Sequence, residues 1–267
     1  NQAQLHRGPD ESGIHQEPGI GLPHRRLSII DLSSGQQPLF NEDHTVVVVY
    51  NGEIYNFSGL AEDLTALGHQ FRTHCDTEVI VHAWEEWGEA CVDRFRGMFA
   101  FALWDRNTET LFLARDRLGI KPLYYSLLPN GQLIFGSELK ALMRHPQLQR
   151  IIDEHAVEDY FALGYVPDPR SIFRHTSKLC PGHTLTLRRG QTSLVQRKYW
   201  DVSFDLQSPA PDREEAAIEL VERLREAVRI RLIAEVPLGA FLSGGVDSSS
   251  VVAMMAQVSD EPVNTCS

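Results

Sequence analysis

The sequence predicts an α+β domain of roughly 200 residues followed by the start of an α/β domain. Apolar, β-branched and aromatic runs follow one another in pairs separated by short turns, which is typical of antiparallel hairpins. Two segments with apolar residues at helical spacing lie among these pairs. Towards the end of the chain the order becomes helix, strand, glycine-rich loop and helix, which is typical of α/β proteins.

A buried central strand is predicted at residues 45–56, TVVVVYNGEIYN. Its four valines and tyrosine form an apolar run of the kind that crosses a sheet covered on both faces. Asn51, Gly52 and Glu53 then supply a side-chain amide, an unhindered N–H group and a carboxylate. A rigid sheet can hold such groups in place to stabilise a developing oxyanion. The alternative is an ordinary Asn-Gly turn after the strand, although the apolar pattern resumes beyond it.

Helices and hairpins account for most of the chain up to residue 200. Leucines at helical spacing predict a helix at residues 60–67 that stops before Gly68, and an apolar stripe predicts a second helix from Asp76 to Gly88. Both helices should lie on one sheet. The remaining predicted elements are a hairpin of residues 98–105 and 110–116, a hairpin of residues 123–128 and 133–135, short helices at residues 138–144 and 153–163, and a hairpin of residues 184–187 and 194–199.

A polar segment with two prolines separates two predicted domains. We place this linker at residues 204–212, between a first domain at residues 1–203 and a second at residues 213–267. The second domain is predicted to contain an amphipathic helix at residues 214–234, a strand at residues 236–242, the loop SGGVDSSS and a helix at residues 251–258.

The loop SGGVDSSS favours phosphate binding. Gly244 and Gly245 let the backbone approach an anion closely, and the N–H groups at the start of the next helix point towards it. The serines can donate to phosphate oxygens, and Asp247 offers a carboxylate to Mg²⁺. The loop lacks the lysine of a GxxxxGK[ST] motif, so it is not a Walker loop. A glycine turn with serine caps is the alternative.

The composition excludes several classes of protein. The chain has 267 residues and a formal net charge of −11, which argues against nucleic acid or an anionic membrane surface as the main partner. The sequence contains neither an apolar run of the roughly 20 residues that a membrane span needs nor an opening that resembles a signal peptide. The four cysteines lack CxxC spacing, which disfavours a zinc site and a disulfide framework and fits a reducing cytoplasm.

Several motifs together resemble a known enzyme family. SGGVDSS resembles the SGGxDS pyrophosphate loop of ATP pyrophosphatases, which adenylate a carboxylate or carbonyl. The segments HRGPDESG, RLSIIDL, YNGEIYNF, CDTEVIVHAWEEWG, FRGMFAFALWD and ARDRLGIKPLYY resemble, in order, the glutaminase domain of class II amidotransferases. Their combination is similar to the glutamine-hydrolysing asparagine synthase family, and THCDTEVIVHAWEEWGEAC and EDYFALGYVPDP are similar to its exosortase-associated bacterial branch.

The resemblance implies a fold and an activity. It implies an N-terminal-nucleophile αββα sandwich of antiparallel sheets, followed by the start of an ATP-pyrophosphatase domain. The implied partners are glutamine, aspartate and ATP, with ATP and Mg²⁺ as cofactors and a homodimer as the assembly. Ammonia from glutamine would attack an adenylated aspartate and yield asparagine, AMP and pyrophosphate.

The resemblance also implies roles for individual residues. Arg26 would hold the glutamine α-carboxylate, because a guanidinium can donate two parallel hydrogen bonds to it. Asp76 would receive the α-ammonium group, and Asn51 and Gly52 would form the oxyanion hole. The implied glutamine-binding residues are Arg26, Leu27, Ser28, Ile29, Ile30, Asn51, Gly52, Glu53 and Asp76. The implied nucleotide, pyrophosphate and Mg²⁺ contacts are Leu242, Ser243, Gly244, Gly245, Asp247 and Ser248, with Asp247 as the metal ligand.

Structural alternatives exist for the charged residues. Asp76 sits where a helix N-cap is expected, and Arg26 has the alternative of a surface cation paired with Asp31. The resemblance implies a structural ion network for Arg115, Asp116, Arg117 and Lys121. Small buried residues rather than nucleophiles are expected for Cys75, Cys91, Cys180 and Cys266.

The sequence departs from the family pattern at both ends. The family's nucleophile is a cysteine at the mature N-terminus, whereas residue 1 here is Asn1, and the chain stops one helix past the phosphate loop. We therefore interpret the chain as an internal fragment and expect this polypeptide alone to lack glutaminase and synthase activity. The alternatives are an amidotransferase for another carboxylate, such as a cell-surface sugar acid or peptide, a β-lactam-forming synthetase, and a catalytically silent glutamine- or nucleotide-binding module.

Overall fold

The computed structural model describes residues 2–31, 34–204 and 212–267, and these divide into two units. The first unit contains the described residues up to Ser28 and from residue 34 to Asp201. The second contains the rest. Within the described residues, no helix is both long enough and apolar enough to cross a membrane.

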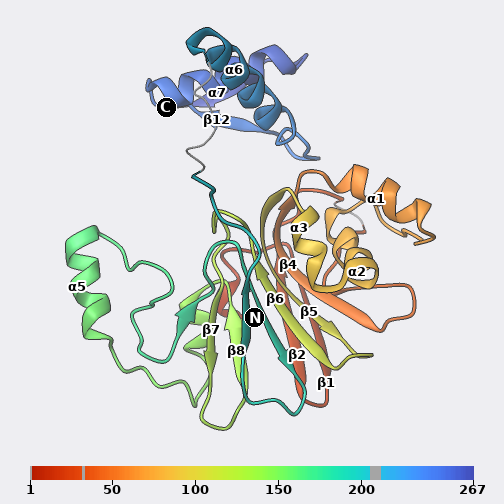
Figure 1. The fold of residues 1–267 in the computed structure, drawn as a ribbon, viewed down its shortest axis with the longest axis vertical. Helices are drawn as coiled ribbons and strands as arrows, with labels where there is room; N and C mark the ends of the chain where they lie inside the picture. Colours follow the sequence, from red (N-terminus) through yellow and green to blue (C-terminus); the bar gives the residue numbers. More distant parts are fainter. Residues whose placement is uncertain (1, 32–33, 205–211) are drawn as a thin grey trace. The chain divides into compact units, whose positions relative to one another are not determined.

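A six-stranded antiparallel sheet forms the centre of the first unit (Figure 1). Its order is β11-β10-β6-β5-β4-β3. The strands are β3 (Leu39–Phe40), β4 (Val46–Ile54), β5 (Gly97–Asp105), β6 (Thr110–Arg115), β10 (His183–Arg188) and β11 (Val195–Lys198). The four valines at the start of β4 are buried, which confirms the predicted buried strand. β4 pairs along its whole length with β5 and is covered on its other edge by the short strand β3.

Helices cover one face of this sheet (Figure 1). They are α1 (Phe57–Ala66), α2 (Asp76–Trp87), η2 (Gly88–Ala90) and α3 (Cys91–Arg94). Alternate residues of β4, including Val48 and Tyr50, pack with Val79 and Ile80 of α2. Both predicted helices are confirmed. Each is followed by a glycine with positive φ, a backbone conformation that glycine adopts readily.

Further strands cover the opposite face. They are the hairpin β1 (Glu11–Glu17) and β2 (Ile20–Arg26) and the three-stranded sheet β8-β7-β9, formed by β7 (Tyr124–Leu127), β8 (Leu133–Gly136) and β9 (Ser177–Lys178). The other alternate residues of β4, Val47 and Val49, pack there with Leu22, Leu123 and Leu179. The predicted hairpins are thereby confirmed.

A short helix, α4 (Leu139–Leu142), completes a fourth layer. Its Leu142 joins Leu128 and Leu148 in a separate apolar cluster against Tyr124 and Ile134 of the smaller sheet. The layers are therefore helix, sheet, sheet and helix, and the expected α+β sandwich of antiparallel sheets is confirmed. The unit also contains η1 (Gln2–Gln4) and α5 (Glu154–Leu163).

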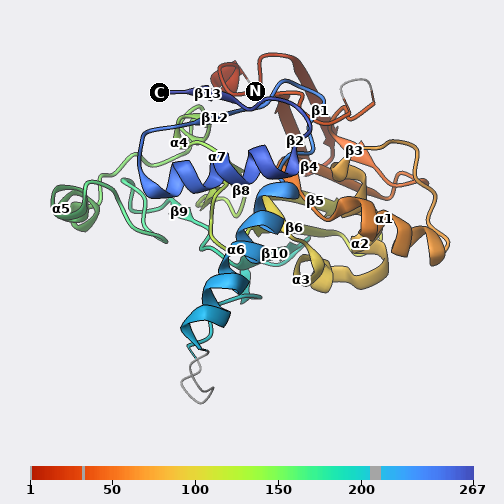
Figure 2. The same cartoon turned by 90° about the horizontal axis from the view of Figure 1, so that it is seen from above.

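The second unit has the expected α/β character. It contains α6 (Arg213–Arg229), β12 (Gly239–Phe241), α7 (Val246–Val258) and β13 (Asn264–Cys266). β12 and β13 are parallel and α7 connects them, so these elements form a βαβ unit. Helices α6 and α7 pack side by side (Figures 1 and 2). α7 begins five residues earlier than predicted, inside the SGGVDSSS motif, and residues 205–211 of the predicted linker lie outside the described residues.

Candidate functional site

Asn51, Gly52 and Glu53 lie within β4 and pair with Ala100, Phe99 and Met98 of β5. The pairing continues to Ile54, so the alternative of an Asn-Gly turn is wrong. A Cβ atom on Gly52 would lie 2.2 Å from the Met98 carbonyl oxygen. The close approach of the two strands therefore requires glycine at this position.

Asp76 joins the start of α2 to β4. Its side chain is 5% exposed, and its Oδ2 atom accepts hydrogen bonds from the Tyr50 hydroxyl at 2.7 Å and the Ile54 N–H at 2.9 Å. The N-cap residue of α2 is Cys75, and the helix has no side-chain cap hydrogen bond. The interpretation of Asp76 as a simple N-cap is therefore wrong. The carboxylate is held against β4 by groups that lie on either side of Asn51, Gly52 and Glu53.

Arg26 is buried at the end of β2. It is 6% exposed, and its guanidinium pairs with the Glu11 carboxylate at 3.2 Å. The alternative of a surface cation is therefore wrong. Arg26 lines a cavity of about 320 Å³, whose other lining residues are Glu11, Ser12, Gly13, His24, Gln36 and Gln37.

The cavity has one fixed cationic group. Burial, together with the charge of Arg26, lowers the pKa of His24 to about 4. His24 is therefore neutral at neutral pH, whereas an arginine keeps its charge. The Arg26 guanidinium carries its N–H donors in a planar fork, and its Nη1 donates to Glu11 Oε2 at 3.2 Å. This cavity is suited to a carboxylate.

Gln37 connects this cavity to β4 and α2. Its side-chain oxygen accepts a hydrogen bond from the Tyr50 N–H at 2.7 Å, and its amide donates to the Thr77 hydroxyl at 3.5 Å. Asn51 and Asp76 do not line the cavity. Gln37, which lines the cavity with Arg26, is linked to Asp76 through Tyr50, whose N–H donates to Gln37 and whose hydroxyl donates to Asp76.

The other predicted glutamine contacts are distributed over both units. Leu27 and Ser28 belong to the first unit, and the Ser28 N–H donates to the Asp10 carboxylate at 2.9 Å. Ile29 and Ile30 belong to the second, where the Ile29 carbonyl accepts a hydrogen bond from Glu235 N–H. Their roles stay predictions.

The SGGVDSSS loop ends on the first turn of α7. Gly244 has φ +80°, and Gly245 is the N-cap without a side-chain cap hydrogen bond. The serine-capped turn is therefore wrong. The Ser248 hydroxyl lies 3.1 Å from that of Ser243 and donates to the Gly245 carbonyl at 3.2 Å. Uncapped N–H groups at a helix start, with hydroxyls beside them, fit a phosphate group.

Comparison with known families identifies the family to which the chain belongs. Residues 1–200 match the family model described as a glutamine amidotransferase domain. The chain belongs to this glutamine amidotransferase family. Residues 219–267 match the asparagine synthase model. These matches confirm the resemblance found in the motifs, while the narrower bacterial branch stays a prediction.

Curated relatives of this amidotransferase cover almost all of the chain. Asparagine synthetase [glutamine-hydrolyzing] 1 of Bacillus subtilis is 39% identical over 95% of this chain and 39% of its own length. A putative asparagine synthetase of Methanocaldococcus jannaschii is 39% identical over 97% of this chain and 53% of its own length. Amidase chyE of Penicillium rubens is 38% identical over 95% of this chain and 37% of its own length. The chain therefore spans about 37–53% of these relatives.

Two solved structures are similar at lower sequence identity. An allosteric regulatory enzyme of purine biosynthesis has a TM-score of 0.46 and 15% identity, covering 92% of this chain and 50% of its own. Glutamine phosphoribosylpyrophosphate amidotransferase from B. subtilis has a TM-score of 0.45 and 14% identity, with the same coverage.

Two members of the expected ion network, Arg115 and Asp116, make structural contacts, while the roles of Arg117 and Lys121 stay predictions. Arg115 donates to Asp168 at 2.9 Å and to backbone carbonyls. Asp116 accepts hydrogen bonds from four backbone N–H groups, those of Phe99, Leu118, Ile120 and Lys121. These bonds hold the loop after β6 and leave the carboxylate satisfied.

The prediction that the four cysteines are buried is confirmed for two of them. Cys75 and Cys91 are buried, and burial raises the pKa of both thiols. Cys180 is half-buried and Cys266 is exposed, so the expectation of small buried residues is wrong for these two. Cys180 lies between β9 and β10, and Cys266 is the last residue of β13. All four thiols are free.

Proposed function

We propose that this chain provides the glutamine-binding domain and the start of the ATP-binding domain of a glutamine-dependent asparagine synthase. Such an enzyme hydrolyses glutamine to glutamate and ammonia and uses the ammonia to amidate adenylated aspartate. The observation that carries the proposal is the buried Arg26 guanidinium in a cavity within the matched amidotransferase domain. The free cysteines fit a reducing cytoplasm as its location.

Each residue would contribute through binding or charge. Arg26 would hold the α-carboxylate of glutamine by paired hydrogen bonds while Glu11 keeps the guanidinium in place. Asp76 would attract the α-ammonium group, and Asn51 and Gly52 would donate to the oxyanion. Glu53 would help to orient the substrate. The nucleophile implied by the family resemblance is an N-terminal cysteine, whose thiol would attack the carboxamide.

Calorimetric titration with L-glutamine tests the proposal without requiring turnover. We expect saturable binding of one glutamine per chain, and no comparable binding of D-glutamine, because the α-carboxylate and α-ammonium sites fix the configuration. Absence of glutamine binding by the folded chain would contradict the proposal. Glutamine binding with no catalytic turnover in any longer form of the protein would favour a silent binding module.

Asp76→Asn separates the proposed binding role of Asp76 from its structural role. The hydrogen bonds from Tyr50 and Ile54 both reach Oδ2, so an amide oxygen in the same place can accept them. We expect the fold to survive and glutamine affinity to fall by roughly tenfold or more, since an amide does not balance the ammonium charge. Calorimetry measures this loss, and an unchanged affinity would show that Asp76 is structural only.

The same variant should change how stability depends on pH. Burial raises the pKa of Asp76, although hydrogen bonds from Ile54 N–H and the Tyr50 hydroxyl oppose this rise. The stability that this carboxyl contributes is full below its unfolded pKa of about 3.9 and is lost as the pH rises through the folded pKa. The unfolding free energy of Asp76→Asn minus that of the wild type should therefore increase over this window, as measured by urea titration at each pH.

The second unit would bind Mg-ATP through its glycine-rich loop. The N–H groups at the start of α7 and the hydroxyls of Ser243 and Ser248 would contact the phosphates, Leu242 would contact the nucleotide, and Asp247 would hold Mg²⁺. When bound, Mg-ATP would supply the adenylyl group that activates a carboxylate. This role depends on the loop chemistry and on the asparagine synthase match at residues 219–267.

Asp247→Asn is expected to weaken Mg-ATP binding by roughly tenfold, because one carboxylate ligand of a metal-bound phosphate is lost. Asp260→Asn is the matched control, since Asp260 is also exposed but lies beyond the end of α7. Fluorescence titration with a labelled ATP analogue in Mg²⁺ measures both. Equal affinities for the two variants would count against Asp247 as the metal ligand.

One observation favours a different carboxylate as the group that receives the ammonia. Amidase chyE of Penicillium rubens is as similar to this chain as some relatives named asparagine synthetase. An amidotransferase of this fold that amidates a sugar acid or a peptide is therefore the alternative function. Stimulation of pyrophosphate release by aspartate would support asparagine synthesis, and stimulation only by another carboxylate would support the alternative.

A further inference from the structure

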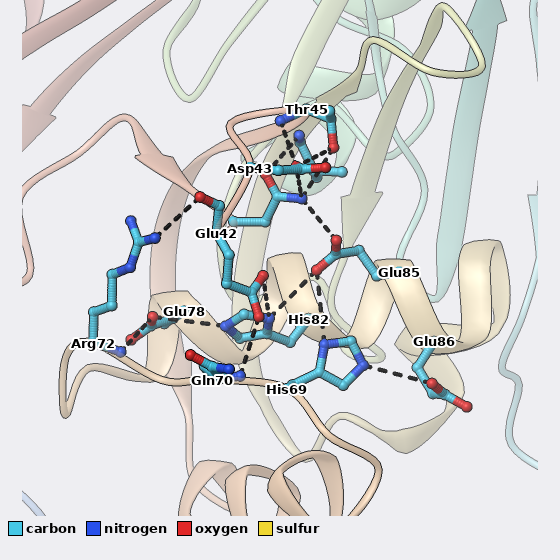
Figure 3. Close-up of polar contacts among 12 residues, drawn as sticks. Glu42, Asp43, Thr45, His69, Gln70, Arg72, Glu78, His82, Glu85 and Glu86 are labelled. Atoms are coloured by element: carbon cyan, nitrogen blue, oxygen red, sulfur yellow. Dashed lines mark hydrogen bonds and ion pairs between the residues drawn. The ribbon is translucent and has the colours of Figure 1, made fainter.

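Two histidines and two glutamates converge in the helical layer of the amidotransferase domain (Figure 3). Glu42 lies between β3 and β4, His69 lies between α1 and α2, and His82 and Glu85 lie on α2. One nitrogen or oxygen atom from each residue lies within 4.8 Å of those of the other three. The group is separate from the cavity that contains Arg26.

The distances within the group are longer than those of hydrogen bonds. His82 Nδ1 lies 3.5 Å from Glu42 Oε2 and 3.4 Å from Glu85 Oε2, and His69 Nδ1 lies 3.8 Å from the same Glu85 oxygen. An N–H···O hydrogen bond has a typical length of about 2.9–3.0 Å. In a tetrahedral zinc site with bonds of about 2.0–2.1 Å, neighbouring ligand atoms are about 3.3–3.4 Å apart. These three separations are closer to the second value, and all four ligand atoms lie within 4.8 Å of one another.

A second contact holds the opposite end of each side chain. Glu42 Oε1 accepts a hydrogen bond from the Gln70 N–H at 3.1 Å, and Glu85 Oε1 accepts one from the Asn41 side chain at 2.7 Å. The other ring nitrogens of the histidines face carboxylates. His82 Nε2 lies 3.6 Å from Glu78, and His69 Nε2 lies 3.5 Å from Glu86. Histidine ligands of metals usually donate the other ring N–H to a carboxylate or carbonyl, and here carboxylates face those nitrogens at ion-pair distances.

His82 gives an independent reason for a cation. Its side chain is fully buried, it packs against Phe71, and neither of its ring nitrogens makes a hydrogen bond. A buried polar group without a hydrogen bond costs about 1–3 kcal/mol. A metal ion held by this ring would give one of these buried nitrogens a partner.

We propose that Glu42, His69, His82 and Glu85 bind a Zn²⁺ ion. Two neutral imidazoles and two carboxylates balance the ion's charge, and mixed nitrogen and oxygen ligands suit zinc. Four protein ligands close the coordination sphere, as in structural zinc sites. The ion joins the segment before β4, the connection between α1 and α2, and α2 itself, the helix that begins at Asp76. It therefore stabilises the helical layer behind the substrate site.

Zinc titration of the metal-free 267-residue chain against a chromophoric chelator tests the site. We expect one Zn²⁺ per chain and a Tm that rises with Zn²⁺ until the site is saturated. His69→Ala and Glu85→Gln each remove one ligand at a partly exposed position, so both variants are expected to fold. Each should bind Zn²⁺ at least about 100-fold more weakly, because even partners behind a ligand contribute 10- to 100-fold.

His155→Ala is the matched control. His155 Nδ1 lies 3.4 Å from Glu158, a separation equal to that in the cluster, but both side chains are more than three-quarters exposed on α5. This variant should keep the wild-type zinc affinity. An adventitious ion only, shown by equal affinities of the wild type, His69→Ala and Glu85→Gln, would overturn the proposal, as would the absence of stoichiometric binding.

X-ray absorption of the wild-type zinc complex gives a readout that does not depend on variants. We expect nitrogen and oxygen ligands at about 2.0–2.1 Å and the scattering pattern of two imidazoles. A sulfur ligand at about 2.3 Å would instead assign the zinc to a cysteine and overturn the site.

Discussion

Arg26→Ala is expected to reduce glutamine affinity by roughly 30- to 4000-fold. Removing one member of a buried, hydrogen-bonded charge pair costs about 2–5 kcal/mol, and each 1.4 kcal/mol is tenfold in Kd. The variant loses the proposed carboxylate ligand and leaves Glu11, its partner at 3.2 Å, as an unbalanced negative charge beside the substrate carboxylate. Calorimetric titration with glutamine measures the loss.

Two further variants show whether the effect belongs to the guanidinium. Arg26→Lys keeps the charge but loses the paired donors, so its affinity should lie between those of Arg26→Ala and the wild type. Arg25→Ala makes the same change in net charge at the next residue of β2, where the side chain bonds to the Gly8 carbonyl and does not line the cavity. Its affinity should equal that of the wild type. If Arg25→Ala and Arg26→Ala weaken binding equally, only general electrostatics is involved.

Secondary structure was predictable where local chemistry determines it. The β-branched valines of β4 favour a strand, and the glycines that follow α1 and α2 adopt the positive φ angles that end a helix. Both signals can be recognised in the sequence. The start of α7 was misplaced because glycine and serine favour a turn locally, whereas the helix begins at Val246. The course of the chain through Asn51 and Gly52 was ambiguous, because only pairing with β5 prevents a turn there.

The candidate site was predictable from motifs but not from periodicity. Arg26 has no local signal of burial, since its environment depends on β1, which supplies Glu11 through antiparallel pairing. Gln37 was missed for the same reason, because its contacts with Tyr50 and Thr77 join segments that are distant in sequence. The proposed zinc ligands give no cysteine-spacing signal, and Glu42, which lies between β3 and β4, is distant in sequence from His82 and Glu85 of α2.

Gly52→Ala is expected to lower the unfolding free energy by about 3 kcal/mol, the upper part of the range for overpacked sites. The new Cβ would lie 2.2 Å from the Met98 carbonyl oxygen and 2.7 Å from the Phe99 Cα. Both atoms belong to the backbone of β5, so no side-chain rotation relieves the clash. The two strands would have to separate in the middle of the sheet, and urea denaturation measures the cost.

Gly59→Ala is the matched control, with the opposite expected sign. Gly59 lies in α1, and a Cβ there would meet no atom within 4 Å. Alanine is favoured over glycine in helices by about 0.5–1 kcal/mol, so this variant should be more stable than the wild type. Wild-type stability of Gly52→Ala would mean that β4 and β5 are not as close as described. Asn51 and Gly52 are the proposed oxyanion donors, and their fixed positions are argued from the close pairing of β4 with β5. That result would therefore also contradict the argument for their placement.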